Sequence, residues 1–347
     1  MVDPGTNGIR RVVVREDGIS IEAADVPKPA PAEALVHMTA AGVCGSDVHA
    51  AHGRHPFVPL PYLPGHEIVG VVREVGAEVH SIRPGQRVVV EPTLPCWTCK
   101  MCTTGRENLC ENLQFFGCGY PQGGMAEQFS ISADRLHPVP EELDERSAAL
   151  IEPLSTPIHA ARLAGGVKGK TVAILGAGTI GLLMLAVVRH QKAARVVITD
   201  VLADKRDRAL RLGADVAIDA SVVDLSGEVR AALGQSADVV FDCVAVQPTV
   251  TAAIAMADKG GTVVVVGVPA AGVTVPLPVI QDHQIRIQGT ATYLPVDFED
   301  SISMLVTGSV NPDEIVTAQL PLVDASAAFD LASSGHHVKV LLTNSTG

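Results

Sequence analysis

Four cysteines gathered in one short segment have the most specific chemistry in the chain. Cys96, Cys99, Cys102 and Cys110 follow a CxxCxxCx7C pattern. Four thiolates this close together can surround one tetrahedral ion and leave no coordination position open, which predicts a structural zinc site. An iron–sulfur cluster also takes four cysteines, but its bacterial spacing is CxxCxxCx3CP, and nothing else here indicates electron transfer. The total of seven cysteines is odd, which favours metal ligation in a reducing compartment over a disulfide framework.

Cys44, His66 and Glu67 are candidates for a second metal site. Cys44 lies in AGVCGSDVHA, and His66 and Glu67 follow in GHE. Taken singly, a cysteine is more often a small buried hydrophobe, and a histidine is more often an ordinary core or surface group. Taken together they offer thiolate, imidazole and carboxylate. A catalytic zinc needs about three such donors and one open position for substrate.

A glycine-rich motif in residues 171–188 predicts a dinucleotide site. The segment TVAILGAGTIGLLMLAVV runs from an apolar strand into a helix and carries GxGxxG at the turn. The first glycine permits the tight turn and the second lets the backbone approach a pyrophosphate. The third lets helix and strand pack closely, with the phosphate over the helix N-terminus. The cofactor-binding residues expected here are Gly176, Gly178, Thr179, Ile180 and Gly181.

The acid that follows this motif favours NAD over NADP. The next predicted strand, RVVIT, ends at Asp200. A carboxylate at that place accepts hydrogen bonds from the adenosine ribose hydroxyls, and its charge repels a 2′-phosphate. Lys205 and Arg206 lie close by, and we interpret them as part of a solvated helix face.

The elements that position these residues differ between two parts of the chain. Before residue 160, short β-rich runs alternate with Gly/Pro turns, which predicts an irregular β domain. From about residue 169, the apolar runs TVAIL, RVVIT, DVAID, ADVVFD and TVVVVG alternate with helical stretches. This alternation predicts an α/β domain with a parallel sheet and helices on both faces. We expect domains at 1–159 and 160–297, with 298–347 packing back on the first.

Composition excludes several classes of function. The 347 residues suffice for about two domains, and 47% are hydrophobic, which argues against bulk disorder. A formal net charge of −12 opposes binding to nucleic acid or to anionic membranes. The apolar runs 171–188 and 260–281 are broken by glycines or prolines and do not indicate membrane spans. The first residues lack the features of a signal peptide, so we expect a cytoplasmic protein.

The motifs, taken in order, resemble the zinc-dependent medium-chain alcohol dehydrogenases. GVCGSDVH, GHE, the four-cysteine segment, EPLS and GAGTIG followed by an acid occur in sequence over nearly the whole chain. Within that family the chain is most similar to the sorbitol, butanediol and threonine dehydrogenase branch. The resemblance implies a discontinuous β-rich GroES-like catalytic domain with a structural zinc lobe at 92–113. It also implies a central Rossmann domain with a doubly wound sheet, and an active site in the cleft between the two domains.

The resemblance also implies roles for individual residues. Cys44 and His66 would bind a catalytic zinc, with Glu67 and Glu152 sharing the remaining protein role, and Asp47 would orient the His66 ring. Ser46 and His49 would carry the proton to solvent. Thr156 and the turn from Val266 to Val268 would lie against the nicotinamide.

Cofactors, substrate and assembly follow from the same resemblance. The cofactors would be NAD and two zinc ions per subunit, one catalytic and one structural. The substrate would be a small-molecule alcohol. Self-association into a homodimer or homotetramer would use the strand at 285–290.

The sequence departs from the family pattern at the substrate. Ala50 stands where an aromatic residue is typical of sorbitol dehydrogenases, and Thr292 and Tyr293 stand where an Arg–Tyr pair is typical. Loss of the arginine removes a donor for a polyol chain, which leaves a smaller diol, another sugar alcohol or a cyclitol as substrate. The alternatives are an L-threonine-type 3-hydroxy amino acid dehydrogenase and a catalytically silent NAD-binding scaffold.

Two further features lie outside the family pattern. His49, His52 and His55 form an HxxHxxH run, which is either a third metal site or part of a substrate-lining or solvated loop. We expect Cys118 and Cys243 to be ordinary thiols.

Overall fold

Residues from both ends of the chain belong to one unit of the structure. The computed structural model describes residues 8–55, 57–269 and 271–344. Unit 1 comprises the residues up to Glu152 and those from Ile315 onward, and unit 2 comprises Pro153–Glu314. Residues 1–7 and 345–347, which the expected domains include, lie outside the described residues.

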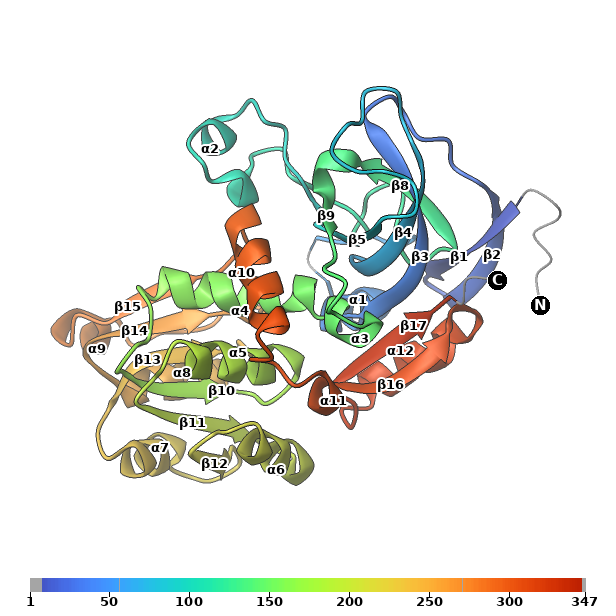
Figure 1. Cartoon of the computed structure of the whole chain (residues 1–347). Coiled ribbons are helices and arrows are strands. Elements are labelled where there is room, and N and C mark those ends of the chain that lie inside the picture. The colour runs from blue at the N-terminus through green and yellow to red at the C-terminus, as the bar shows by residue number, and fades with distance from the viewer. Residues whose placement is uncertain (1–7, 56, 270, 345–347) are drawn as a thin grey trace. The chain divides into compact units, whose positions relative to one another are not determined.

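A seven-stranded sheet forms the framework of unit 1 (Figure 1). Its order is β16-β17-β3-β4-β5-β9, with β8 also paired to β3. β17 lies antiparallel to β3, with Val340 opposite Val43, and this pairing joins the C-terminal segment to the first part of the chain. The strands of unit 1 are β1 (Gly8–Arg15), β2 (Gly18–Asp25), β3 (Glu33–Val43), β4 (Glu67–Val75), β5 (Arg87–Val90), β6 (Thr93–Leu94), β7 (Gln114–Phe115), β8 (Gln128–Ser132), β9 (Leu136–Pro138), β16 (Val316–Pro321) and β17 (Lys339–Thr343).

Short helices connect these strands. α1 follows β3 directly and carries the residues of the CGSDVH motif. The helices of unit 1 are α1 (Gly45–Ala51), α2 (Lys100–Thr103), η1 (Glu107–Leu109), η2 (Ala133–Arg135), α3 (Glu145–Ala148), η3 (Leu322–Asp324) and α12 (Ala325–Ser333).

Unit 2 is built on a six-stranded parallel sheet with the order β12-β11-β10-β13-β14-β15. Numbered within the unit, this is the 3-2-1-4-5-6 order of the doubly wound dinucleotide-binding fold, which confirms the predicted fold class. Its strands are β10 (Thr171–Leu175), β11 (Arg195–Asp200), β12 (Val216–Asp219), β13 (Ala237–Asp242), β14 (Ala257–Val265) and β15 (Arg286–Gly289). Its helices are α4 (Ile151–Leu163, whose first two residues fall in unit 1), α5 (Thr179–His190), α6 (Ala203–Arg211), α7 (Leu225–Leu233), α8 (Gln247–Met256), α9 (Leu277–Asp282) and α10 (Pro295–Val306), with α11 (Pro312–Ile315) at the boundary.

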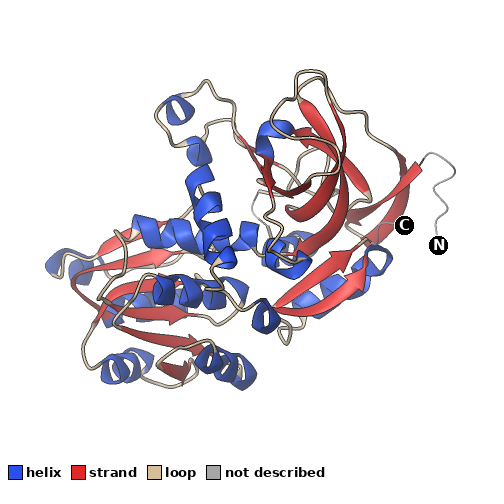
Figure 2. Cartoon of the chain, in the orientation of Figure 1, coloured by secondary structure: helices blue, strands red, loops and turns tan. Residues whose placement is uncertain are grey.

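Both faces of this sheet are covered, as its apolar strands require (Figure 2). Ala173 and Leu175 of β10 share a core with residues of α7 and α8. Val172 and Ile174 point to the opposite face and are fully buried as well. Strands buried on both faces read as continuous apolar runs, which is why TVAIL lacks polar alternation.

A buried charge cluster keeps α10 in unit 2. Asp297, fully buried at the start of α10, accepts hydrogen bonds from Arg162 Nε at 2.9 Å and from the backbone N–H of Leu294 at 2.8 Å. Its other partner is His159, whose Nδ1 lies 2.8 Å from Asp297 Oδ2. His159 and Arg162 both lie on α4. Unit 2 therefore extends to Glu314, beyond the boundary at 297 that the change in sequence character indicates.

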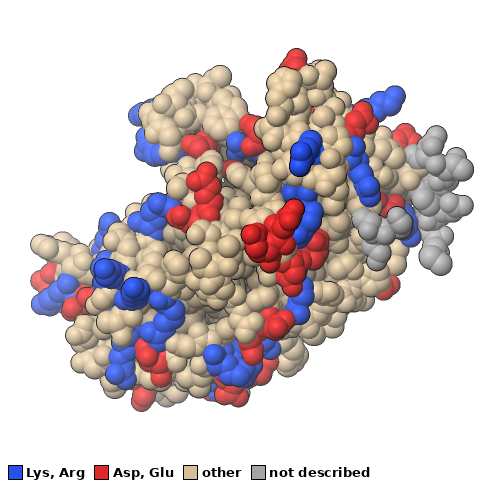
Figure 3. Space-filling view, in the orientation of Figure 1, with Lys and Arg blue, Asp and Glu red and all other residues tan. Residues whose placement is uncertain are grey.

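On the face shown in Figure 3, Lys and Arg are interspersed with Asp and Glu, so this face has no broad basic surface. Every helix among the described residues is too short or too polar to cross a bilayer.

Candidate active site

The four cysteines of the predicted structural site come together in the segment around α2. The sulfurs of Cys96, Cys99, Cys102 and Cys110 all lie within 4.8 Å of one another. Cys99 Sγ is 3.5 Å from Cys102 Sγ and 3.9 Å from Cys110 Sγ. Zinc–sulfur bonds of about 2.3 Å in a tetrahedron place neighbouring sulfurs about 3.8 Å apart. The spacing therefore fits a single ion.

Local donors prepare these sulfurs to carry negative charge. The backbone N–H groups of Cys96 and Asn112 donate to Cys110 Sγ at 3.2 and 3.3 Å. Hydrogen bonds from the side chain and backbone of Thr98 lower the pKa of Cys96 to about 5. Thiolates are the form that binds metal, so the donor set fits zinc.

Trp97 connects this segment to the body of unit 1. Its ring lies over the guanidinium of Arg135, 5.2 Å from the ring centroid. Arg135 in turn forms an ion pair with the buried Glu91 at 2.9 Å, and His137 Nε2 lies 2.7 Å from the other oxygen of Glu91. The chain has one tryptophan, so its fluorescence reports on this segment.

A second donor set lies where β3 ends and β4 begins. Cys44, His66 and Glu67 place a sulfur, a ring nitrogen and a carboxylate oxygen within 4.8 Å of one another. His66 and Glu67 are buried and Cys44 is half-buried. Cys44 is the N-cap of α1 and directly follows β3, while Glu67 is the first residue of the neighbouring strand β4. The β3–β4 pairing, with Gly42 opposite Glu67, brings the two motifs together.

Asp47, predicted to orient the His66 ring, lies near that ring without a hydrogen bond to it. Its carboxylate is fully buried, with Oδ1 3.8 Å from His66 Nδ1 and Oδ2 accepting from the backbone N–H of Cys44 at 3.1 Å. Tyr62 donates its hydroxyl to the backbone carbonyl of Asp47 at 3.3 Å. Burial raises the pKa of Asp47 above its ordinary value, although the charge of His66 lowers it.

Glu67 forms a buried ion pair that sequence analysis missed. Lys339 Nζ donates to both carboxylate oxygens of Glu67, at 2.6 and 2.7 Å, and both side chains are at most 2% exposed. Burial lowers the pKa of Lys339, but Glu67 and Cys44 raise it, and the balance lies above the ordinary value. Gly42 makes room for this pair, since a Cβ there would lie 1.8 Å from Glu67 Oε2.

Glu152 lies outside the set of three donors. It is buried near the start of α4, and its charge contributes to raising the pKa of Lys339. The group of atoms within 4.8 Å consists of Cys44, His66 and Glu67.

The predicted relay residues share one short helix. Ser46 is half-buried in the first turn of α1, and His49 is exposed in its last turn. Residues three apart lie on one face of a helix. The N-cap is Cys44 and not Ser46, so the hydroxyl of Ser46 is not used for capping.

The HxxHxxH run does not form a metal-ligand group in the described part of the chain. His52 is exposed, with Nδ1 2.7 Å from the backbone carbonyl of Val48. His55 is half-buried and accepts from the backbone N–H of Phe57 at 3.2 Å. Burial, and then the charges of His49 and His66, lower the pKa of His55, which places its ring within electrostatic reach of both.

Unit 2 places the glycine-rich motif between β10 and α5. Gly176 has φ +93°, and a Cβ on Gly181 would lie 1.8 Å from the carbonyl oxygen of Gly176. Both positions therefore require glycine. A Cβ on Gly178, the N-cap of α5, would meet nothing within 4 Å, so this position has open space where a phosphate can approach. Thr179 and Ile180 are half-buried in the first turn of α5.

Asp200 lies at the end of β11 and is tied to the same turn. Its carboxylate accepts from the backbone N–H groups of Ala177 and Leu202 at 2.8 and 2.9 Å. Arg206 donates to the backbone carbonyl of Asp200 at 2.9 Å and pairs with Asp219 at 3.2 Å. Arg206 is therefore held by local partners and is not only part of a solvated helix face.

The residues predicted to lie at the nicotinamide occupy separate elements of unit 2. Thr156 is half-buried on α4, and Val266 is buried at the carboxyl end of β14. Val268, two residues on, is 54% exposed. Tyr293 is 2% exposed, with its ring 5.3 Å from that of Phe298 in α10.

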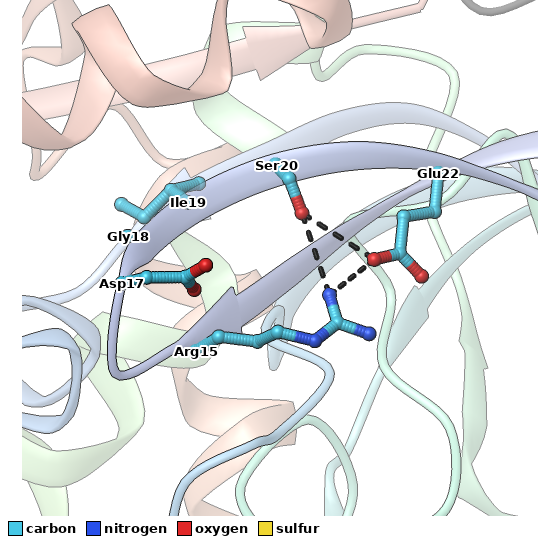
Figure 4. A pocket seen from close by; sticks show the side chains of 6 residues that line it. All are labelled: Arg15, Asp17, Gly18, Ile19, Ser20 and Glu22. Atoms are coloured by element: carbon cyan, nitrogen blue, oxygen red, sulfur yellow. Dashed lines mark hydrogen bonds and ion pairs between the residues drawn. The ribbon is translucent and has the colours of Figure 1, made fainter.

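A hollow on the β1–β2 hairpin is lined by none of the metal-binding or glycine-motif residues described above (Figure 4). Arg15 points toward Glu22 and Ser20, and hydrogen bonds link the three side chains. Its charged groups thus satisfy one another.

Sequence analysis missed three residues of the site. Lys339 could have been identified, because it is the first residue of the apolar strand KVLLT and becomes buried when that strand joins a sheet. No local signal marked Tyr62. The expectation that Cys118 is an ordinary thiol is wrong, since its Sγ lies 3.5 Å from His66 Nδ1.

Two family models match the chain. The model of the alcohol dehydrogenase GroES-like domain matches residues 30–141, and that of the zinc-binding dehydrogenases matches residues 179–307. Together they include Cys44, His66, the four-cysteine segment and, of the three glycines in the glycine-rich motif, Gly181.

Individual relatives extend the similarity to almost the whole chain. Sorbitol dehydrogenase of Ovis aries is 34% identical over 344 residues, which are 98% of this chain and 97% of that protein. A zinc-binding dehydrogenase from Sinorhizobium meliloti 1021, solved with NADP bound, superposes with a TM-score of 0.91 at 32% identity and covers 98% of this chain and 100% of that one. The 2R,3R-butanediol dehydrogenase of Bacillus subtilis gives a TM-score of 0.89 at 27% identity, with coverage of 97% and 100%.

Proposed function

The chain belongs to the zinc-dependent medium-chain alcohol dehydrogenase family, and on that premise we propose that Cys44, His66 and a glutamate form its catalytic zinc site. The enzyme is a zinc- and NAD-dependent oxidoreductase that acts on polyols or diols. The grouping of Cys44, His66 and Glu67 within 4.8 Å carries the proposal. No relative favours the L-threonine-type enzyme or the silent scaffold over it.

The donor set fits a catalytic zinc ion. Sulfur, imidazole nitrogen and carboxylate oxygen are the ligands of open zinc sites. When bound, zinc supplies a Lewis acid that polarises the alcohol oxygen, and NAD supplies the hydride acceptor. Glu67 already pairs with Lys339 at 2.6 Å, and we propose that Glu67 and Glu152 share the remaining protein role, directly or through water.

Three residues of α1 surround the site and move the proton. Asp47 Oδ1 lies 3.8 Å from His66 Nδ1 and adds negative charge there, and its own position is fixed by the N–H of Cys44. The Ser46 hydroxyl would take the proton released by the alcohol as it gives its own to the cofactor ribose, from which His49 would pass a proton on. The exposure of His49 lets it exchange that proton with solvent.

The substrate is a small diol or a short polyol in this proposal. Ala50 is small and buried where a bulky residue would fill space, and Thr292 offers no positive charge. Tyr293 is buried in unit 2, so its ring does not replace the missing donors. A longer sugar alcohol would therefore lack charged partners for its distal hydroxyls.

Cofactor preference follows from Asp200. A carboxylate fixed by two backbone N–H groups cannot turn away from the adenosine ribose without losing both hydrogen bonds. Its charge repels a 2′-phosphate, so NAD is preferred.

We also propose that the enzyme is cytoplasmic and forms a homodimer or homotetramer. β15 is the edge strand of the unit 2 sheet, and Ile287 on it is 41% exposed. An exposed edge strand with an apolar side chain is a ready template for pairing with a second copy.

The test is NADH formation from NAD and a panel of diols, sugar alcohols, cyclitols and L-threonine, followed by absorbance, with and without a zinc chelator. We expect chelator-sensitive turnover of one diol or polyol class. Cys44→Ser should abolish turnover while NADH binding persists. Turnover by Cys44→Ser at the wild-type rate would refute the zinc assignment, and turnover of L-threonine alone would refute the substrate class.

A further inference from the structure

Two groups lie close to Nδ1 of the His66 ring. Cys118 Sγ lies 3.5 Å from His66 Nδ1, and Asp47 Oδ1 lies 3.8 Å from the same atom. Sulfur is large, so 3.5 Å is a hydrogen-bond distance for it, whereas an N–H···O bond rarely exceeds 3.2 Å. The sulfur is therefore the nearer partner of Nδ1.

The backbone holds Cys118 in this place. A Cβ on Gly117 would lie 2.1 Å from the carbonyl oxygen of Gly65, so only glycine lets the two segments touch. Gly65 directly precedes His66. The backbone N–H of Cys118 donates to the carbonyl of Phe115 at 3.1 Å, and this turn also sets the Phe115 ring edge-on to His66, with centroids 5.6 Å apart.

Asp47 is not free to take over the contact. Oδ2 of its carboxylate already accepts from the backbone N–H of Cys44 at 3.1 Å. Tyr62 holds the backbone of Asp47 through a 3.3 Å hydrogen bond to its carbonyl. To close the gap to Nδ1, the carboxylate would have to rotate away from Cys44, the residue it fixes at the start of α1.

We propose that Cys118 is a positioning residue for His66, whose sulfur accepts the hydrogen bond from Nδ1–H. A histidine that gives one ring nitrogen to a metal donates from the other, and the partner of that N–H fixes the tautomer and the ring orientation. Cys118 thus keeps the Nε2 lone pair of His66 available to the metal. The inference rests on the proposed role of His66 as a zinc ligand.

Zinc binding by the whole enzyme tests the inference without reference to turnover. Chelator competition should resolve two zinc ions per chain. In Cys118→Ala we expect one of them to bind about tenfold more weakly, the lower end of the effect of removing such partners. Cys118→Ser keeps an acceptor at the same place and should stay within about threefold of wild type on the same scale. Cys243→Ala, a thiol in unit 2, is the matched control and should leave both ions unchanged.

A spectroscopic measurement separates positioning from packing. With Co²⁺ in place of zinc, Cys118→Ala should alter the visible d–d bands of the catalytic ion, and Cys118→Ser should restore them. Wild-type affinity in Cys118→Ala, or equal weakening in the alanine and serine variants, would overturn the inference. If wild-type enzyme binds both ions but oxidises no alcohol, the proposed function fails while the Cys118 comparison still gives its answer.

Discussion

Replacing Lys339 by methionine should destabilise unit 1. In wild type, Lys339 Nζ lies 2.6 and 2.7 Å from the two oxygens of Glu67, and neither side chain is more than 2% exposed. Methionine preserves much of the volume and removes the charge. Glu67 would then be a buried carboxylate without its partner, which costs about 3–5 kcal/mol.

Urea unfolding followed by Trp97 fluorescence measures this in unit 1. We expect a loss of about 3–5 kcal/mol at pH 8. Combining Lys339→Met with Glu67→Gln should recover at least half of the loss, since both charges are then gone. Arg15→Met is the matched control in the same unit: it breaks the partly exposed Arg15–Glu22 pair, at a cost below about 1 kcal/mol.

Two results would refute this reasoning. A loss below about 1 kcal/mol at pH 8 would mean that the pair behaves like a surface pair. A double variant as unstable as Lys339→Met would point to lost packing instead of lost charge.

Four further predictions concern other parts of the chain. Cys102→Ser should release the structural zinc and shift the emission of Trp97, whereas unchanged fluorescence would place the ion elsewhere. Ala245→Gly should stabilise unit 2 by about 0.5–1 kcal/mol in urea unfolding followed by circular dichroism, because Ala245 has φ +58°; a loss of stability would contradict this. Burial raises the pKa of Asp297 but hydrogen bonds from His159 and Leu294 lower it below its ordinary value, so its carboxylate stabilises unit 2 above about pH 4 and this contribution disappears as the pH falls further. Asp297→Asn should therefore flatten the acid limb of the stability profile, and an unaltered limb would show that other carboxylates dominate it. Asp200→Asn should lower the preference for NAD over NADP in kcat/KM about tenfold, as removal of about 1–4 kcal/mol of charge repulsion requires, and an unchanged ratio would remove Asp200 as the determinant.

The fold of unit 2 could be predicted because its information is local. Five of its six strands contain a short apolar run, and each strand is followed by a helix, so the right-handed crossover rule leaves few possible sheet orders. Gly176 and Asp200 mark the ends of β10 and β11, which are neighbours in the sheet. Spacing along the chain was therefore enough to place both at one edge.

Unit 1 could be predicted only in outline, because its contacts are remote in sequence. β17 pairs with β3 across almost the full length of the chain, and no pattern in KVLLT specifies that partner. The contacts of α10 are also with residues remote in sequence. The alternation of apolar strands and helices ends before it, so sequence analysis assigned α10 to the C-terminal segment. Asp297 keeps α10 in unit 2 through His159 and Arg162, and a buried pairing of this kind is set by packing, not by spacing.

The metal ligands could therefore be predicted from the sequence, whereas the residues that contact those ligands could not. A ligand must match the chemistry of the ion, so Cys44 and His66 are limited to a few residue types in fixed contexts. Lys339 and Cys118 act on ligands through one contact each, and any strand or turn that reaches the site can supply that contact. Lys339 determines how much negative charge Glu67 offers, and Cys118 determines which nitrogen of His66 is available. Relatives that share every ligand can thus differ in metal affinity, because the residues that set it lie outside the motifs that define the family.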